Sequence, residues 1–173
     1  MEDVALLELG RTVVLVALVI LSGGLDLRTN RIPNAITVPA FGLGLALAGL
    51  VGFGSLLAHL AAAAITLLVG TALFATRVLG GGDVKMMVAV AAIIGPAPLP
   101  LAFLLACIAG CILAVVDSLR RGTLLRVLRS SKDMVLHWAS LGRFGRPPVK
   151  SGGVGAIPYG VAIGIGALLA WFL

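Results

Sequence analysis

The stretch that decides the fold is Val4–Leu25, VALLELGRTVVLVALVILSGGL, which ends directly before Asp26. A membrane-spanning helix needs about 20 largely apolar residues, and this stretch is long enough. Its N-terminal flank carries Glu2, Asp3 and Glu8, whereas a cleaved signal peptide carries positive charge there. The stretch therefore predicts a membrane helix that stays in the mature protein.

The composition of the whole chain supports the same environment. Of its 173 residues 60% are hydrophobic and only 12% are charged, about half the charged fraction of an ordinary soluble domain. The net charge of +6 is not accompanied by aromatic residues interleaved with basic ones, so we predict no nucleic-acid partner. The positive charge is better explained by anionic lipid head groups.

Apolar runs continue along the chain and predict an all-α membrane protein. We expect about six transmembrane helices in a single polytopic domain, residues 1–173. The runs are Val4–Leu25, Pro33–Val51, Phe53–Val78, Val84–Ile94, Leu101–Val116 and Val154–Leu173. The fourth is short for a full bilayer and ends at the proline-rich turn 95–100.

Basic residues predict the orientation of these helices. Twelve of the thirteen lysines and arginines fall after the first, third and fifth helices, and only Arg11 lies elsewhere. By the positive-inside rule these loops are cytoplasmic, so both termini are predicted to lie outside. Most of this charge is in the segment 118–153, whose residues 123–141 place apolar and basic side chains on opposite helical faces. We interpret this segment as a cytoplasmic, interfacial amphipathic helix; a solvated basic connector is the alternative.

Two aspartates are placed unusually. Asp26 follows the first apolar run, and Asp83 follows Gly80-Gly81-Gly82 and opens another. The predicted topology puts both at the cytoplasmic edge, where ionisable groups are costly and usually functional. Two carboxylates at close range do not both ionise, so one is able to activate water while the other donates a proton. Without side chains, the glycines allow positive φ and let a substrate strand approach the backbone closely. Sequence alone leaves open that each aspartate only caps a helix or neutralises a basic neighbour.

Other reactive residue types give weaker signals. Cys107 and Cys111, four residues apart, are interpreted as thiols packed in the core, and they are too few for a metal site. We predict no metal and no cofactor. His59 and His137 show no partner spacing and receive no role.

Three motifs resemble those of the bacterial type IV prepilin peptidases. Residues 26–34, DLRTNRIPN, resemble that family's aspartate-to-Ile-Pro-Asn motif, and residues 80–85, GGGDVK, resemble its Gly-x-Gly-Asp motif with a following lysine. Ile157-Pro158-Tyr159-Gly160 is similar to the Pro-Tyr-Gly element that opens the last helix. The resemblance implies an aspartic endopeptidase of the bacterial inner membrane with Asp26 and Asp83 as the catalytic pair. It implies prepilin or pseudopilin precursors as partners, cut after the leader's terminal glycine.

The chain shows no domain with paired CxxC motifs, and in this respect it resembles the short form of the family that serves tight-adherence (Flp-type) pili. The resemblance also suggests supporting residues. Lys85 is expected to contact substrate or a catalytic carboxylate, or else lipid phosphate. Arg28 and Arg31 receive an acidic substrate residue or only determine topology. The remaining candidates that shape the site are Gly80, Gly81, Gly82, Pro33, Asn34 and Tyr159, with Pro33 expected in the first helical turn and Tyr159 possible also as an interfacial anchor.

Two rival functions remain open at this point. An ion-coupled small carrier would use the aspartates as a proton relay, although the chain shows no convincing inverted repeat. A non-catalytic component of a pilus or secretion assembly would use them structurally. The sequence does not indicate the oligomeric state.

Overall fold

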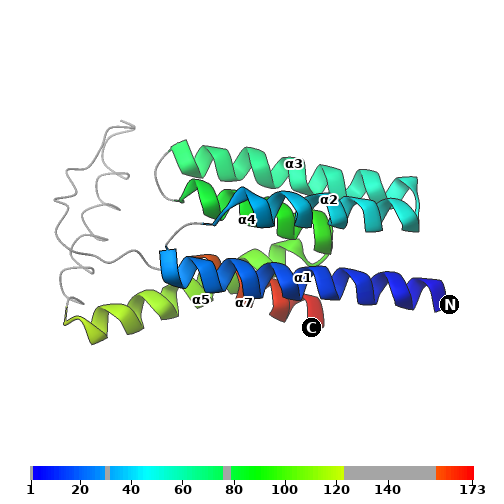
Figure 1. Cartoon of the computed structure of the whole chain (residues 1–173). Helices are drawn as coiled ribbons and strands as arrows, with labels where there is room; N and C mark the ends of the chain where they lie inside the picture. The colour runs from blue at the N-terminus through cyan, green and yellow to red at the C-terminus, as the bar shows by residue number, and fades with distance from the viewer. Residues whose placement is uncertain (1, 30–31, 76–78, 123–158) are drawn as a thin grey trace. The chain divides into compact units, whose positions relative to one another are not determined.

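In the computed structural model the structure describes residues 2–29, 32–75, 79–122 and 159–173. These residues form six helices and no strand, which confirms the all-α prediction (Figure 1). The helices are α1 (Glu2–Thr29), α2 (Asn34–Val51), α3 (Phe53–Ala75), α4 (Gly81–Ile94), α5 (Leu99–Arg120) and α7 (Tyr159–Phe172). The contacts between residues divide the chain into two compact units, 1–110 with 158–173, and 111–157.

The membrane character is confirmed at a coarser level than six spans. Four helices are long and apolar enough to cross a membrane, namely α1 from Val4 onward, α2, α3 and α5. α7 is a shorter apolar helix. α4 has 14 residues and extends about 21 Å at 1.5 Å per residue, which is less than the ~30 Å hydrocarbon core. The chain is a multi-pass membrane protein, and α4 is not one of its candidate spans.

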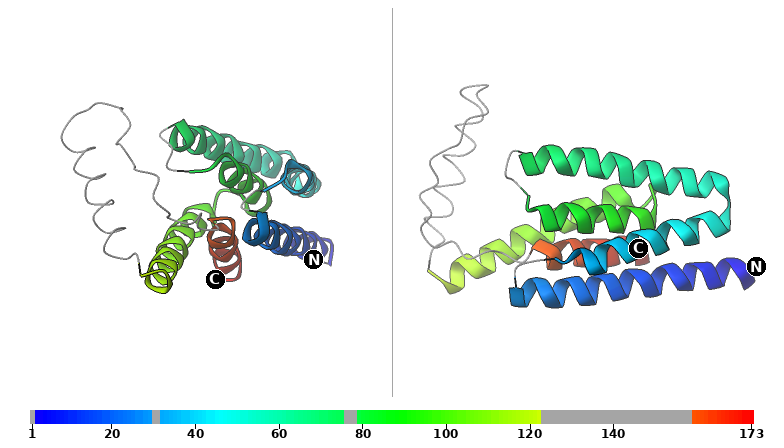
Figure 2. Two further views of the ribbon diagram at one scale, coloured as in Figure 1. Left: turned by 60° about the vertical axis from the view of Figure 1, so that its left-hand side comes forward. Right: turned by 45° about the horizontal axis from the view of Figure 1, so that its top comes forward.

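α4 is the core of the first unit. It contacts α1, α2, α3 and α7, and two further views show it among these helices (Figure 2). A helix that is apolar on all sides is buried on all sides. Six of its residues are completely buried: Met86, Ala89, Val90, Ala91, Ala92 and Ile93.

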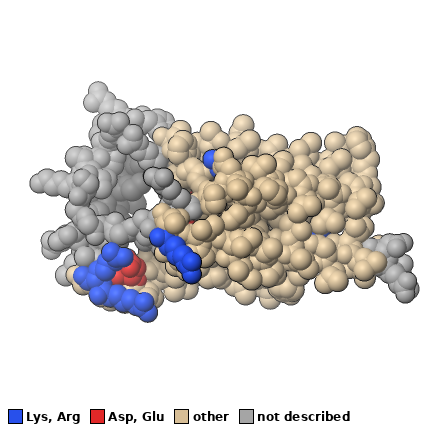
Figure 3. All heavy atoms as spheres, in the orientation of Figure 1, with Lys and Arg blue, Asp and Glu red and all other residues tan. Residues whose placement is uncertain are grey.

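The outer faces of the surrounding helices are apolar. Large hydrophobic side chains such as Ile20, Leu50 and Leu68 are more than half exposed. On the face drawn in Figure 3 most of the described surface carries no charge. Such a surface is unfavourable in water and is the expected contact surface for lipid.

Glycines allow the helices to approach one another closely. A Cβ atom built on Gly44 of α2 would lie 2.9 Å from the backbone of Ala92 in α4. A Cβ on Gly166 of α7 would overlap the backbone of α5 at Ala102 and Ala106. Helices in lipid have no hydrophobic driving force for association, and the close packing that small residues allow holds them together instead.

Several predicted boundaries are wrong. α1 continues to Thr29, so Asp26 lies inside the helix rather than after it. α4 begins at Gly81, and α5 continues to Arg120, into the segment predicted to be amphipathic. Polar residues continue these helices beyond the apolar runs, so the end of an apolar run at a membrane edge does not mark the end of the helix. The predicted amphipathic helix, residues 123–141, lies outside the described residues.

The two cysteines are also placed differently from the prediction. Cys107 and Cys111 are both free, as expected, but both are exposed on α5. Their apolar surroundings in the sequence predicted packing in a protein core. In a membrane helix the same surroundings are equally consistent with a side chain that faces lipid.

Candidate active site

Asp26 lies in the next-to-last turn of α1 and is 94% buried, with an exposed fraction of 6%. Its Oδ2 accepts a hydrogen bond of 2.8 Å from the backbone N–H of Gly160. Gly160 is the second residue of α7, and the first N–H groups of a helix have no partner within the helix. The carboxyl group of Asp26 therefore caps α7 from a neighbouring helix, at the end where the helix dipole favours negative charge.

Asp83 is the third residue of α4 and is half-buried. Its Oδ2 accepts a hydrogen bond of 3.1 Å from the N–H of Gly80, the residue that precedes the helix. Burial raises the pKa of Asp83, the hydrogen bond from Gly80 lowers it, and the charge of Asp26 raises it. The carboxyl groups of Asp26 and Asp83 are therefore close enough to interact electrostatically, although they lie 57 positions apart in the sequence.

Ile32 connects the surroundings of the two aspartates. It is buried, and its Cβ would lie 3.3 Å from a Cβ atom built on Gly82, the neighbour of Asp83. On the other side, its Cδ1 would lie 2.9 Å from a Cβ on Gly160, the residue that donates to Asp26. Ile32 thus packs between the two carboxyl-bearing segments.

Ile32 belongs to one of the motifs described above, but it is not among the site residues predicted from the sequence. The available signal was an isolated apolar side chain directly after the polar residues 28–31. A residue of this kind between polar neighbours is often buried, because its hydrophobic area gains most from leaving water.

The two carboxyl groups accept from backbone N–H groups and make no direct hydrogen bond to each other in the described part of the chain. Each predicted catalytic residue therefore also serves as a helix cap. The two contacts are those expected of helix caps, and they are also compatible with a catalytic role of the same carboxyl groups.

Lys85 contacts neither of these carboxylates in the structure. Its Nζ donates a hydrogen bond of 2.8 Å to Oδ1 of Asn34, the first residue of α2. Among the described residues it forms no ion pair. Pro33 is the N-cap of α2, one position before the predicted first turn, with φ −75° and ψ 146°.

The glycine triplet does not use the positive φ that glycine allows. Gly80 has φ −77°, and Gly81 and Gly82 are the first two residues of α4. Within the described ranges the positive-φ glycines are Gly52, Gly95 and Gly122. The triplet matters instead for its small size, because a Cβ on Gly80 would lie 2.9 Å from Oδ2 of Asp83.

The remaining candidates are Arg28, Arg31 and Tyr159. Arg28 is exposed in the last turn of α1, and Arg31 lies outside the described residues. Tyr159 is the first residue of α7 and is 38% exposed. Its Cε1 would lie 3.3 Å from a Cβ atom on Gly110 of α5. Within the described ranges no group of three or more His, Cys, Asp or Glu side chains is arranged to hold a metal ion.

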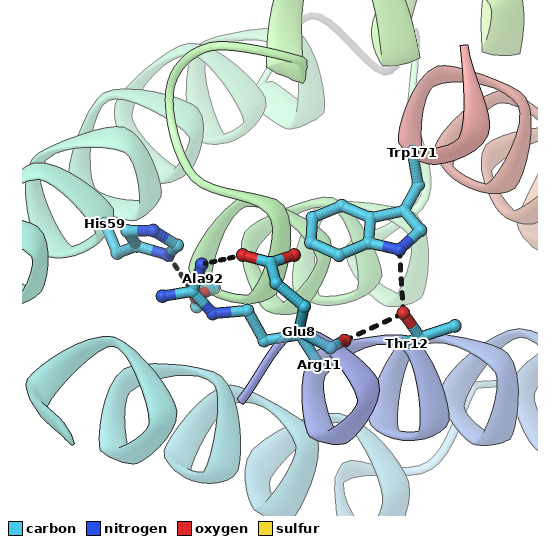
Figure 4. Close-up of polar contacts among 6 residues, drawn as sticks. All are labelled: Glu8, Arg11, Thr12, His59, Ala92 and Trp171. Atoms are coloured by element: carbon cyan, nitrogen blue, oxygen red, sulfur yellow. Dashed lines mark hydrogen bonds and ion pairs between the residues drawn. The ribbon is translucent and has the colours of Figure 1, made fainter. Parts of the chain in front are cut away.

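A second set of polar contacts involves other residues of the same helices (Figure 4). Nδ1 of buried His59 in α3 lies 2.9 Å from the carbonyl oxygen of Ala92, and since a carbonyl only accepts, Nδ1 is the donor. Ala92 belongs to the last turn of α4, whose carbonyls have no partner within the helix. Gly95, which ends α4 with φ 75°, leaves room for the ring, because a Cβ there would lie 2.6 Å from Nε2 of His59. His59 was given no role from the sequence; its signal was a polar residue within an otherwise apolar helix.

α1 contributes the other members of this set. Nη1 of buried Arg11 lies 3.5 Å from Oε1 of Glu8, and Trp171 of α7 donates to the hydroxyl of Thr12 at 2.9 Å. Arg11 and His59 thus have structural surroundings of their own, separate from the hydrogen bonds of the two aspartates.

Comparison with known proteins gives one match. Residues 13–115 match the family model described as the type IV leader peptidase family. The matched range is more than half of the chain and includes both aspartates, Ile32, Asn34 and Lys85. No curated protein and no solved structure matches the chain. The chain therefore belongs to the type IV leader peptidase family, and it is a prepilin leader peptidase of the aspartic class.

Proposed function

We propose that Asp26 and Asp83 are the catalytic pair with which this enzyme cleaves the leader from prepilin-like precursors. The supporting observations are that the charge of Asp26 in α1 acts on Asp83 in α4, and that Ile32 packs against both Gly82 and Gly160 beside them. Both aspartates lie within the range that matches the peptidase family. Family membership supplies the reaction class and the prepilin substrate, and the surroundings of Asp26 and Asp83 support their choice as the catalytic residues.

The two carboxyl groups differ in their suitability for the two proton transfers. The charge of Asp26 contributes to the raised pKa of Asp83, and in the proposed mechanism we assign the shared proton to Asp83. Asp26 is then the ionised base, supported by the N–H of Gly160 at the N-terminus of α7.

The reaction follows from these protonation states. Asp26 removes a proton from a water molecule, whose oxygen attacks the carbonyl carbon of the scissile peptide, and Asp83 gives its proton to the carbonyl oxygen. When the tetrahedral intermediate collapses, the C–N bond breaks and the leaving nitrogen takes up the proton held by Asp26. Asp83 regains a proton as the new carboxyl group forms.

The proposed setting is the cytoplasmic edge of a bacterial inner membrane, with both termini outside. It is supported by the distribution of basic residues in the sequence and by the position of Asp26 near the C-terminal end of the spanning helix α1. The proposed substrates are pilin or pseudopilin precursors, and the Flp-type precursors of tight-adherence pili are the first to be tested.

Cleavage of a co-expressed Flp-type prepilin, read as a gel shift, tests the proposal. We expect the wild type to cut, and Asp26→Asn and Asp83→Asn to be inserted in the membrane but inactive. Asp117→Asn is the matched control, because Asp117 pairs with Arg121 on α5 and takes no part in the site. Full cleavage by either site variant contradicts the two-carboxylate mechanism. A wild type that cuts none of a panel of prepilins and pseudopilins contradicts the proposed substrate, and the carrier and assembly functions then become the leading explanations.

A further inference from the structure

The hydrogen bond from Lys85 to Asn34 joins α4 to α2 at the same end of α4 as Asp83. Lys85 follows Asp83 by two residues, and Asn34 follows Ile32 by two residues. At 2.8 Å the bond is short, and its donor is charged, which makes it stronger than a neutral hydrogen bond. Both side chains are exposed, so neither contributes to the apolar core.

Lys85 is not oriented toward the catalytic carboxyl groups. Residues i and i+2 of a helix do not face each other, so Lys85 and Asp83 project in different directions. The side chain between them, Val84, packs on Gly70 of α3, where a Cβ would lie 2.8 Å from its Cγ1. An effect of Lys85 on the two aspartates therefore acts through the position of the helices.

The two ends of the contact between α2 and α4 are built differently. At Gly44 the helix backbones nearly touch, so their separation there is fixed by packing. At the other end α2 begins at Asn34, and the Lys85–Asn34 hydrogen bond links it to α4. Pro33 lies directly before Asn34, and its ring restricts φ. A shift of Asn34 therefore also moves Ile32, because the residue between them is stiff.

Ile32 in turn determines the space between the segments that hold the aspartates. It packs against Gly82 on one side and on the other against Gly160, whose N–H donates to Asp26. A displacement of Ile32 therefore changes the separation of Asp26 and Asp83.

We propose that Asn34 and Lys85 form a positioning pair that, through Pro33 and Ile32, sets the separation of the two catalytic aspartates. This inference rests on the proposed catalytic role of Asp26 and Asp83. It assigns Lys85 neither to the substrate nor to lipid, and it gives the amide of Asn34 a partner that the sequence motifs do not indicate.

The test is the steady-state kinetics of prepilin cleavage by the purified enzyme in detergent. We expect Asn34→Ala and Lys85→Ala each to lower kcat roughly 10- to 100-fold, because a misplacement of about 1 Å at a catalytic centre costs about 100-fold. KM is expected to change less than about twofold, since the proposal places neither residue in contact with substrate. The double variant should be no slower than the slower single variant, because coupled residues are not additive.

Two further variants separate positioning from a general loss of structure or charge. Asn34→Asp keeps an oxygen acceptor for Lys85 and adds a negative charge at a helix N-terminus, so it should retain kcat. Arg120→Gln removes an exposed positive charge from α5 and should cleave like the wild type. Melting temperatures in detergent show whether each variant is folded. If Asn34→Ala is not folded, Lys85→Ala and Asn34→Asp are compared instead: kcat should fall in the first and be retained in the second.

Three results would overturn the positioning role while leaving the proposed function intact. They are wild-type kcat in both alanine variants, an increase in KM at unchanged kcat, and multiplicative losses in the double variant. Failure of the proposed function is distinguished by the wild type itself, or by Asp26→Asn and Asp83→Asn, in the same assay.

Discussion

Substitution of Gly160 by alanine offers a quantitative test of the geometry around Asp26. The added Cβ would lie 2.8 Å from Oδ2 of Asp26 and 2.9 Å from Cδ1 of Ile32, whereas ordinary van der Waals contact begins at 3.4 Å. The carboxyl group must therefore retreat by 0.6 Å, the difference between 3.4 and 2.8 Å. The same displacement lengthens the hydrogen bond from the Gly160 N–H, now 2.8 Å.

The energetic cost has two opposing parts. A hydrogen bond to a charged group contributes about 1.5–3 kcal/mol, and its weakening destabilises the start of α7. Alanine in place of glycine in a helix stabilises it by about 1 kcal/mol. The net loss of stability is therefore small, roughly 1 kcal/mol. The effect on catalysis is larger: at about 100-fold for 1 Å, a 0.6 Å displacement lowers kcat about tenfold.

The assay compares kcat for prepilin cleavage by Gly160→Ala with that of Gly42→Ala. Gly42 also lies inside a helix, but a Cβ there meets nothing within 4 Å, so its variant should cleave at the wild-type rate. The melting temperature of both variants should stay within a few degrees of the wild type. Equal kcat for Gly160→Ala and Gly42→Ala would refute the reasoning, because it would mean that Asp26 is not held at the position that the contact defines.

Four further outcomes are expected. Gly166→Leu should lower the melting temperature in detergent strongly, with a loss of roughly 3 kcal/mol or more, because its side chain meets the backbone of α5, which is unable to move aside; an unchanged melting temperature would contradict this packing. His59→Leu should destabilise the fold by about 1–3 kcal/mol, because the carbonyl of Ala92 loses its donor; urea or thermal unfolding measures the change, and a neutral result would mean that water replaces the ring. In Asp26→Asn the pKa of Asp83 should fall below its wild-type value, because the charge that raises it is removed; carbon NMR of labelled aspartate measures it, and an unchanged pKa would show that the two carboxyl groups are not coupled. In the wild type, kcat should decline as the pH rises through the pKa of Asp83, because the proton donor is then lost.

The helices themselves were largely predictable from the sequence. The apolar runs located all six described helices. Lipid offers no hydrogen-bond partner to the backbone, so a long apolar run that enters lipid must pair its own N–H and C=O groups in a helix. The same reasoning predicted that Asp26 and Asp83 are unusual, since a carboxyl group beside such a run is costly. These conclusions need only local composition and the physics of a bilayer.

The environment of each helix was not predictable in the same way. α2 and α4 are both apolar runs, but residues 89–93 of α4 are completely buried by protein while α2 exposes Val38 and Leu50. In a soluble protein an apolar face indicates the core, but in a membrane lipid and protein interiors are equally apolar. For the same reason the sequence placed Cys107 and Cys111 in the core, although both are exposed.

The sequence by itself determined that this protein consists of membrane helices and that two aspartates, in recognisable motifs, are its candidate catalytic groups. Only the tertiary structure decided which groups these aspartates contact: Gly160 donates to Asp26, Gly80 donates to Asp83, and Ile32 packs between them. The physical reason is that Gly160 and Asp26 are separated by 134 positions and meet only after the helices pack. Contacts between helices depend on the rotation and depth of each helix, which apolar composition does not encode and which close packing at a few glycines determines.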